Sequence, residues 1–417
     1  MKSRSLAVLL ASVSLAWSTP ASADVVTNWN LITITCVLGA APSIPAGRGG
    51  PTGTIDIALV QAAVHDAVQA IQGRYGSYKY ENRARLGSGS PEAAAAAAAH
   101  SMLTGLYGST LACLNGVPNP ATTYPGDPGL QAGYKAADEL LRYKRPAFMT
   151  ERDPFVGGTE PGEWRPAPGV TAPGANVYMG ETEPFTLLHP RQFRPEPPPP
   201  LVSQQYAREY DEVKRLGSLT GSERTAEQTD LARFWGDFIG QWFRAMRNIA
   251  DEHLSDVGDT ARLFALAALA AADSQITVYE TKYHYNFWRP VTAIREGDND
   301  GNPSTVGDPA WVSFSTTPPY PDQSSGANNI TGAITTILQL FFGTDEFDFS
   351  VSSTASGLLT NPRTYTRFSE AQQEVVDVRV YQGIHFRFAD EDGRQQGARV
   401  GHWVFQKFLR PLPGGKQ

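Results

Sequence analysis

Apolar residues recur along most of this chain at the three- and four-residue spacing of helices that bury one face. The clearest early example is 55–73, where Gly73 provides a stop signal. A second helix, 91–107, opens with Pro-Glu and continues through an alanine block, which has high helix propensity. The same spacing predicts helices at 129–143, 202–216, 225–252, 258–288, 324–343, 369–383 and 393–409. Strand-like alternation is scarce, so the pattern predicts an all-α fold.

Residues 145–200 interrupt this helical pattern with many prolines and glycines and end in the run Pro197–Pro200. A stretch that long without regular structure inside a compact protein usually runs over the surface or forms a lid. The helices on either side look like parts of one core. We therefore predict one large helical domain, 24–417, built as a bundle or as two bundles, with 145–200 as a Pro/Gly-rich excursion.

The first residues have the features of an export signal. Two basic residues precede a mostly apolar run of twelve residues, Leu6–Trp17, and residues 21–23 read Ala-Ser-Ala, an A-x-A cleavage site. We expect residues 1–23 to be a signal peptide and the mature protein to be secreted or periplasmic. The apolar run is too short to span a bilayer as a helix, and we expect no later stretch to span one.

Charge and cysteine content narrow the classes of partner. The formal net charge is −7, and it becomes −9 once Lys2 and Arg4 leave with the signal peptide. An acidic chain without a basic run argues against nucleic acid and anionic membrane surfaces as partners. The two cysteines, Cys36 and Cys113, fit either one disulfide in an oxidising compartment or two buried thiols.

The first segment with candidate chemistry carries two cations, Lys282 and Arg289, with only aromatic and polar uncharged side chains between them. Seven residues are almost two helical turns, which would place both cations on one helix face, about 10 Å apart. Pro290 biases Arg289 away from helical geometry and would let its guanidinium turn inward. A solvated basic edge would show the same pattern.

Two later segments add candidate anion ligands. Ser325-Gly326 opens a predicted helix and offers a hydroxyl and several unpaired backbone N–H groups, although an ordinary helix cap has the same pattern. Arg379 is followed six positions later by His385, with a glycine between them that lets the backbone bend. This pair could direct a cation and a nucleophilic imidazole to one point, whereas a lone His among aromatic residues is also common in cores.

Taken in this order, the three segments resemble the signature of the vanadium-dependent haloperoxidases and their relatives, the type 2 phosphatidic acid phosphatases and bacterial acid phosphatases. That signature reads Lys, six residues, Arg-Pro; later Pro-Ser-Gly-His; later Ser-Arg, five residues, His. The matching residues lie within 282–390 and are Lys282, Arg289, Pro290, Ser325, Gly326, Arg379 and His385. Looser patterns at 64–68 and 162–166 resemble bacterial haloperoxidase-like secreted proteins and extend the likeness over most of the mature chain.

The resemblance implies a pocket for a tetrahedral oxyanion, either vanadate as cofactor or phosphate in the same site. Both are multiply charged anions, which Arg binds by planar bidentate donation and Lys as a compact point charge. A hydroxyl and a backbone N–H would complete the cradle. The oxyanion-binding residues would be Lys282, Arg289, Ser325, Gly326 and Arg379.

The resemblance also implies that His385 is the catalytic residue and the vanadium ligand. Bonding to vanadium, or to phosphorus in a phosphatase, requires a neutral imidazole nitrogen. In a haloperoxidase the vanadium acts as a Lewis acid without changing oxidation state, and hydrogen peroxide and a halide are the small-molecule substrates. Tyr320 would line the pocket beside the halide.

The chain departs from the signature at the position of its acid–base residue. Ala327 stands where the family has His, and Ser324 stands where it has Pro. Val378 replaces the Ser before the Arg, and the acid expected at Ala389 is one place late, at Asp390. General acid–base help contributes roughly 10²–10⁴ in rate, and an alkoxide leaving group needs a proton, so phosphate-ester hydrolysis should suffer most.

Other proton donors are conceivable near this gap. Tyr320, Asp322 and Asn328 lie close to it in sequence, whereas His284 would point away from the Lys282 face of a straight helix.

The leading hypothesis is a vanadate-binding, haloperoxidase-like oxidoreductase that oxidises bromide or iodide with hydrogen peroxide. The alternatives are a phosphatase that acts through a phosphohistidine at His385, and a non-catalytic oxyanion-binding relative that lost its acid at Ala327.

Overall fold

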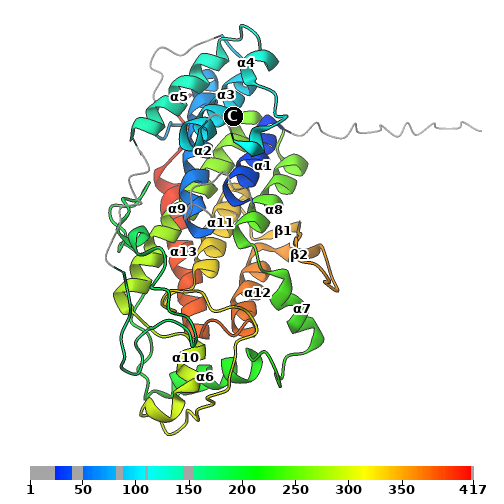
Figure 1. Ribbon diagram of the computed structural model, residues 1–417. Helices are drawn as coiled ribbons and strands as arrows, with labels where there is room; N and C mark the ends of the chain where they lie inside the picture. The colour runs from blue at the N-terminus through cyan, green and yellow to red at the C-terminus, as the bar shows by residue number, and fades with distance from the viewer. Residues whose placement is uncertain (1–23, 40–49, 81–87, 109–110, 144–153, 415–417) are drawn as a thin grey trace, which may run out of the picture.

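Helices make up nearly all the regular structure of the described chain and stack into an elongated body (Figure 1). The computed structural model describes residues 24–39, 50–80, 88–108, 111–143 and 154–414. The longer helices are α1 (Val25–Leu38), α2 (Gly53–Gln72), α3 (Pro91–Tyr107), α5 (Gly129–Tyr143), α6 (Gln204–Leu216), α7 (Ala226–Phe234), α8 (Phe238–His253), α9 (Val257–Tyr285), α11 (Gly326–Phe342), α12 (Phe368–Tyr381) and α13 (Arg387–Lys407). The shorter ones are α4 (Pro120–Thr123), α10 (Pro290–Arg295), η1 (Gly50–Thr52), η2 (Ala112–Leu114), η3 (Val177–Glu181) and η4 (Gly297–Asn299). The all-α prediction is confirmed. The signal peptide predicted at 1–23 lies outside the described residues.

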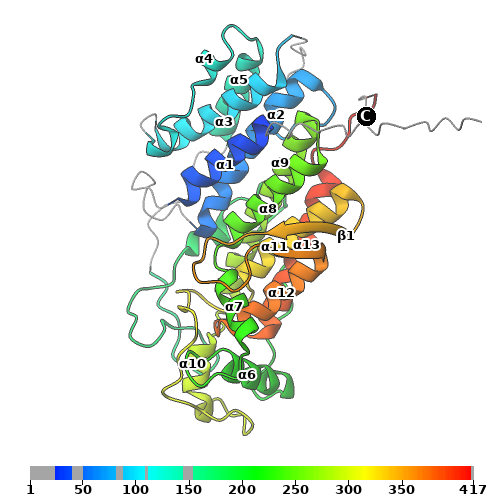
Figure 2. The ribbon, with the colours of Figure 1, turned by 90° about the vertical axis from the view of Figure 1, so that its right-hand side faces the viewer.

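The helices form two groups that share α9 (Figures 1 and 2). At one end of the body, α3, α4 and α5 lie beside α1 and α2, and at the other end lie α6 and α10. Between these ends, α9 packs against α2 on one side and against α11 and α13 on the other. One hydrophobic cluster draws buried side chains from both groups, and a smaller aromatic cluster fills the end near α6 and α10.

The central helix α9 is buried over most of its length, and its middle is rich in alanine and leucine, as expected of a helix surrounded by other elements. Asp256 caps its first turn by accepting a hydrogen bond from the backbone N–H of Asp259. By length and composition alone α9 could cross a membrane. Its apolar stretch is wholly buried inside the protein, and no other helix of the described chain meets those criteria.

Several elements differ from the prediction. The helix expected at 225–252 is two helices, because the chain turns at Trp235–Asp237 and Asp237 then caps α8 through the N–H of Gly240. The pattern did not predict α1, nor the antiparallel hairpin of β1 (Glu346–Val351) and β2 (Arg363–Arg367).

The described part of the predicted excursion, 154–200, packs closely against the helical body. Trp164 and Met179 are buried, and η3 lies against α9. The carboxylate of Asp273 in α9 accepts hydrogen bonds from the N–H groups of Phe185 and Thr186, at 2.6 and 2.7 Å. These bonds fix the returning chain on α9.

The two cysteines are bridged. Cys36 in α1 and Cys113 in η2 form a disulfide with their Cα atoms 5.3 Å apart, which ties two segments 77 positions apart in sequence. The structure thus decides between the two alternatives that the sequence left open.

Candidate oxyanion site

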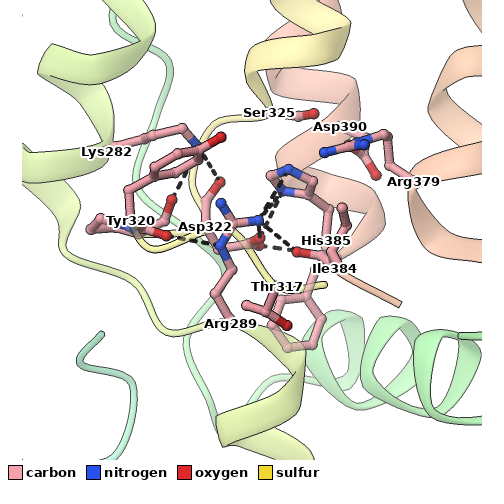
Figure 3. Close-up of polar contacts among 12 residues, drawn as sticks. Lys282, Arg289, Thr317, Tyr320, Asp322, Ser325, Arg379, Ile384, His385 and Asp390 are labelled. Atoms are coloured by element: carbon pink, nitrogen blue, oxygen red, sulfur yellow. Dashed lines mark hydrogen bonds and ion pairs between the residues drawn. The ribbon is translucent and has the colours of Figure 1, made fainter. Parts of the chain in front are cut away.

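A cavity of about 190 Å³ opens where α8, α9, α11 and α12 approach one another. Six of the residues singled out from the sequence line this cavity, namely Lys282, Tyr320, Gly326, Ala327, Arg379 and His385. The other two, Arg289 and Ser325, are buried behind the wall: Arg289 contacts the lining residue His385, and Ser325 directly precedes the lining residue Gly326. Segments far apart in sequence therefore converge on one space (Figure 3).

Lys282 lies in the last turn of α9 and is fully buried. Its ammonium donates hydrogen bonds to the backbone oxygens of Pro321 and Asp322, both at 3.0 Å, and lies 5.1 Å from the ring centre of Tyr320. Burial, followed by repulsion from Arg289, lowers the pKa of Lys282 well below its usual value. An anion in the cavity would favour the charged form.

Arg289 reaches the same region by a different route from the one predicted. The prediction of a helix face shared with Lys282 is wrong, because α9 ends at Tyr285 and Asn286 takes a left-handed conformation with φ 51°. Arg289 is extended, with φ −87° and ψ 155°, as expected before Pro290.

The guanidinium of Arg289 is held between two chain segments. Its Nε donates to the backbone oxygen of Tyr320 at 2.9 Å, and its Nη1 donates to that of Ile384 at 2.7 Å. Its Nη2 is buried and has no hydrogen-bond partner among the described residues. The chain reversal after α9 therefore leaves one guanidinium nitrogen available beside the cavity.

His385 lies in the turn between α12 and α13 and lines the cavity although it is almost fully buried. Its Nδ1 is 2.7 Å from Oδ1 of Asp322, and its Nε2 is 3.1 Å from Nη1 of Arg289. The carboxylate assigns the proton to Nδ1 and leaves a lone pair on Nε2. Burial and the nearby Arg289 and Arg379 lower the pKa of His385 well below its usual value. The imidazole is therefore neutral, as a ligand or nucleophile must be.

Asp322, which the sequence analysis named only as a possible proton donor, contacts His385 directly. It is fully buried, and its Oδ1 lies 3.4 Å from Nη1 of Arg289 as well as against His385. Burial raises the pKa of Asp322 to about 7, against the lowering effect of Arg289 and Lys282. Its only signal in the sequence was an acid three positions before Ser325, which does not reveal that it pairs with His385.

Arg379 approaches from α12. Its guanidinium lies over the ring of Phe238, 5.0 Å from the ring centre, and Nη1 donates to the side chain of Gln382. Its Nε is buried without a hydrogen-bond partner in the part of the chain that the structure describes. Burial lowers the pKa of Arg379 to about 10, so the guanidinium stays charged at neutral pH.

Ser325 caps no backbone N–H with its side chain, although it precedes α11. Its hydroxyl interacts with the carboxyl of Asp390 and with the amide of Asn328, and it is not part of the cavity lining. The first backbone N–H groups of α11, beginning with Gly326, therefore have no side-chain cap and can serve an anion.

A second buried carboxyl, Asp390, lies behind the site. It accepts a hydrogen bond from the amide of Asn328 at 2.8 Å, and burial raises the pKa of Asp390 well above its usual value. The raised pKa favours the neutral form of Asp390, so of the two buried carboxyls it is Asp322, with a pKa of about 7, that can offset part of the positive charge. The other candidate donor, His284, faces away from the site as predicted and contacts Arg194.

Comparisons with known proteins place this arrangement in context. Residues 262–414 match the family described as the VCPO second helical-bundle domain. The vanadium chloroperoxidase of Curvularia inaequalis is 26% identical over a match of 199 residues, and the match covers 40% of this chain and 32% of that enzyme. This chain thus matches about a third of the length of that enzyme.

Solved structures share the fold over nearly the whole chain. The first bacterial vanadium-dependent iodoperoxidase has a TM-score of 0.75 and 23% identity, over 93% of this chain and 96% of that one. A holo-type bacterial vanadium-dependent chloroperoxidase has a TM-score of 0.71 and 15% identity, over 94% and 98% of the two chains. At these identities the likeness shows the fold alone, which is the helical bundle of vanadium haloperoxidases.

Proposed function

Because the chain is related to the vanadium haloperoxidases by its fold and by residues 262–414, we propose that it is a vanadate-binding haloperoxidase that oxidises a halide with hydrogen peroxide. The observation that carries this proposal is a neutral imidazole on the wall of a cavity, with Nε of Arg379 on the same wall and Nη2 of Arg289 behind it, both buried and without a hydrogen-bond partner among the described residues. The signal-like residues 1–23 support export to the periplasm or the exterior as part of the same proposal.

The residues present fit a tetrahedral oxyanion. A buried N–H without an acceptor costs about 1–3 kcal/mol, and Nη2 of Arg289 and Nε of Arg379 both lack one among the described residues. Oxyanion oxygens would accept from these groups, from the ammonium of Lys282 and from the N–H of Gly326. His385 Nε2 would be the protein ligand to vanadium.

Each side chain then has a definite task. Bound vanadate supplies a Lewis-acid centre that polarises peroxide oxygen. Asp322 holds the proton on Nδ1 of His385, so Nε2, which lies 3.1 Å from Nη1 of Arg289, keeps the lone pair that would bind vanadium. Lys282, Arg289 and Arg379 would neutralise negative charge in a largely buried site, where each electrostatic interaction is stronger than in water. Tyr320 borders the cavity with its ring against Lys282 and Arg289, both at 5.1 Å.

Phosphate transfer is the less favoured use of the same cradle. The neutral His385 suits a phosphohistidine intermediate, but Ala327 cannot protonate the leaving alkoxide. A third possibility, oxyanion binding without turnover, agrees with the loss of the acid–base residue at Ala327.

A set of parallel assays separates these functions. The purified protein is incubated with orthovanadate, and iodide and bromide oxidation by hydrogen peroxide is followed by absorbance, with His385→Ala as the control. Hydrolysis of p-nitrophenyl phosphate is measured without vanadate. We expect halide oxidation that requires vanadate and disappears in H385A. Hydrolysis alone would support the phosphatase, and retention of one anion without either reaction would support a binding protein.

A further inference from the structure

Asp237 is a cavity-lining carboxylate that has no role in the proposed function. It lines the same cavity as Ala327, Arg379 and His385, and its exposure places it toward the solvent side of that cavity. As the N-cap of α8 it accepts the N–H of Gly240 on Oδ1 at 3.1 Å. Within the described chain Oδ2 has no hydrogen-bond partner, so one carboxyl oxygen is available to a molecule in the cavity.

The other ionisable groups of this cavity wall have contacts or roles of their own, and the hydroxyls of Tyr279 and Tyr320 interact with each other. Lys282 and Arg379 serve as cations, and the proton of His385 is held on Nδ1 by Asp322. Burial raises the pKa of Tyr279 well above its usual value, so its hydroxyl gives up a proton least readily.

The carboxyls behind the wall are committed too. Asp322 is engaged with His385 and Arg289, and Asp390 is engaged with Asn328. Among the described residues, Asp237 is the carboxyl that lines the cavity itself.

We propose that Asp237 carries the exchangeable proton of the oxyanion site, in place of the acid that is missing at Ala327. A proton from solvent binds the carboxylate oxygen when an oxyanion enters, and the neutral carboxyl donates a hydrogen bond to that anion. No other bond is made or broken in this step. The inference rests on the proposed function in that both use one oxyanion cavity.

The negative charge of an incoming oxyanion favours the protonated form of Asp237. An ionised Asp237 would repel an incoming oxyanion, whereas a protonated one donates to it. Partial desolvation already raises the pKa of Asp237, against the lowering effects of the Gly240 N–H and of Arg244 on the same helix. Across the cavity it faces the charged or titratable groups of Lys282 and Tyr279 on α9, Tyr320, Arg379 on α12, and His385.

The test measures proton uptake rather than catalysis. Inorganic phosphate is titrated into the purified protein by calorimetry in buffers of different ionisation enthalpy, between pH 6 and 8, for wild type and Asp237→Asn. Asn and Asp are equally good N-caps, so the start of α8 is kept. Asp256→Asn is the matched control, because Asp256 caps α9 in the same way but does not line the cavity.

We expect D237N to take up fewer protons than wild type by up to about one per phosphate bound, because the Asn side chain cannot be protonated. Its phosphate affinity should fall less steeply with rising pH, and D256N should match wild type. Equal uptake and equal pH dependence in D237N and wild type would overturn the inference. Asp237→Ser, another good N-cap without an acid, repeats the comparison if D237N does not fold.

Halide oxidation then separates this inference from the proposed function. With vanadate bound, D237N should oxidise iodide at least tenfold more slowly than wild type, and Ala327→His in the same chain should restore the rate. A wild type without halide oxidation, but with the expected loss of proton uptake in D237N, would overturn the proposed function and keep Asp237 as the proton carrier. An active wild type with unchanged D237N uptake and rate would do the reverse.

Discussion

Replacing Asp322 by Asn separates anion binding from turnover, because Asp322 opposes the first and supports the second. Its carboxylate lies 2.7 Å from Nδ1 of His385 in a fully buried setting and sets the imidazole tautomer. Asn has nearly the same shape, but its amide can also donate to Nδ1 and so move the proton to Nε2. The variant thus removes the charge and the tautomer control while leaving the packing largely intact.

The expected size follows from the contact that is lost. A hydrogen bond to a charged group contributes about 1.5–3 kcal/mol. With about 1.4 kcal/mol per factor of ten, turnover should fall roughly tenfold to a hundredfold. Binding should change in the opposite direction, because a buried negative charge beside Arg289 is removed. We expect D322N to bind phosphate at least as tightly as wild type.

Steady-state iodide oxidation and calorimetric phosphate titration measure the two effects on the same preparations. Weaker phosphate binding together with normal turnover would refute the reasoning, because it would mean that Asp322 supports the anion rather than His385.

The same variant tests a pH effect on stability. The pKa of Asp322 is raised from 3.8 to about 7, so its contribution is fully present below pH 4 and is lost as pH rises through 7. The free energy of unfolding of wild type relative to D322N should therefore decrease between pH 4 and 7. Denaturant titrations at several pH values give this difference, and a flat or rising difference would contradict the assignment.

Three further variants test the cradle. Lys282→Met removes a buried ammonium group whose pKa is strongly lowered, so it should raise the Tm measured without phosphate and abolish the stabilisation by phosphate. The control Lys407→Met replaces an exposed lysine and should change neither quantity. Gly393→Ala should weaken phosphate binding, measured by titration, tenfold or more. The added Cβ would lie 2.4 Å from the backbone oxygen of Ser325 and push the start of α11 away. Unchanged affinity would show that this close approach does not position the site. Ala327→His alone should raise hydrolysis of p-nitrophenyl phosphate above that of wild type by about tenfold or more, and no gain would mean that the missing acid is not the defect.

Periodicity predicted the helices well where one face is buried, and it failed where a local contact ends the helix. The helix predicted at 225–252 is divided because Asp237 caps a new helix. The helix predicted to reach residue 288 ends at Tyr285, because Asn286 takes a left-handed conformation. The hairpin of β1 and β2 depends on pairing between segments separated by a loop, which an apolar pattern alone does not specify.

The cationic residues and the histidine of the candidate site could be proposed from the sequence, because their order and spacing along the chain form a recognisable motif. The convergence of Lys282, Arg379 and His385 on one cavity follows that prediction. The tasks of Asp322 and Asp237 could not be read in the same way, because each depends on a contact made only after folding. A count of positive side chains also overstated the charge of the site, since ionised Asp322 offsets part of it.

The central claim is that Lys282, Arg289, Arg379 and His385 enclose one oxyanion. Crystals soaked in orthovanadate, with diffraction data collected at the vanadium absorption edge, test it most directly. The account predicts a single anomalous peak in the cavity, within bonding distance of Nε2 of His385 and within reach of the three cationic side chains. A cavity without vanadium, or vanadium bound elsewhere on the protein, would contradict it.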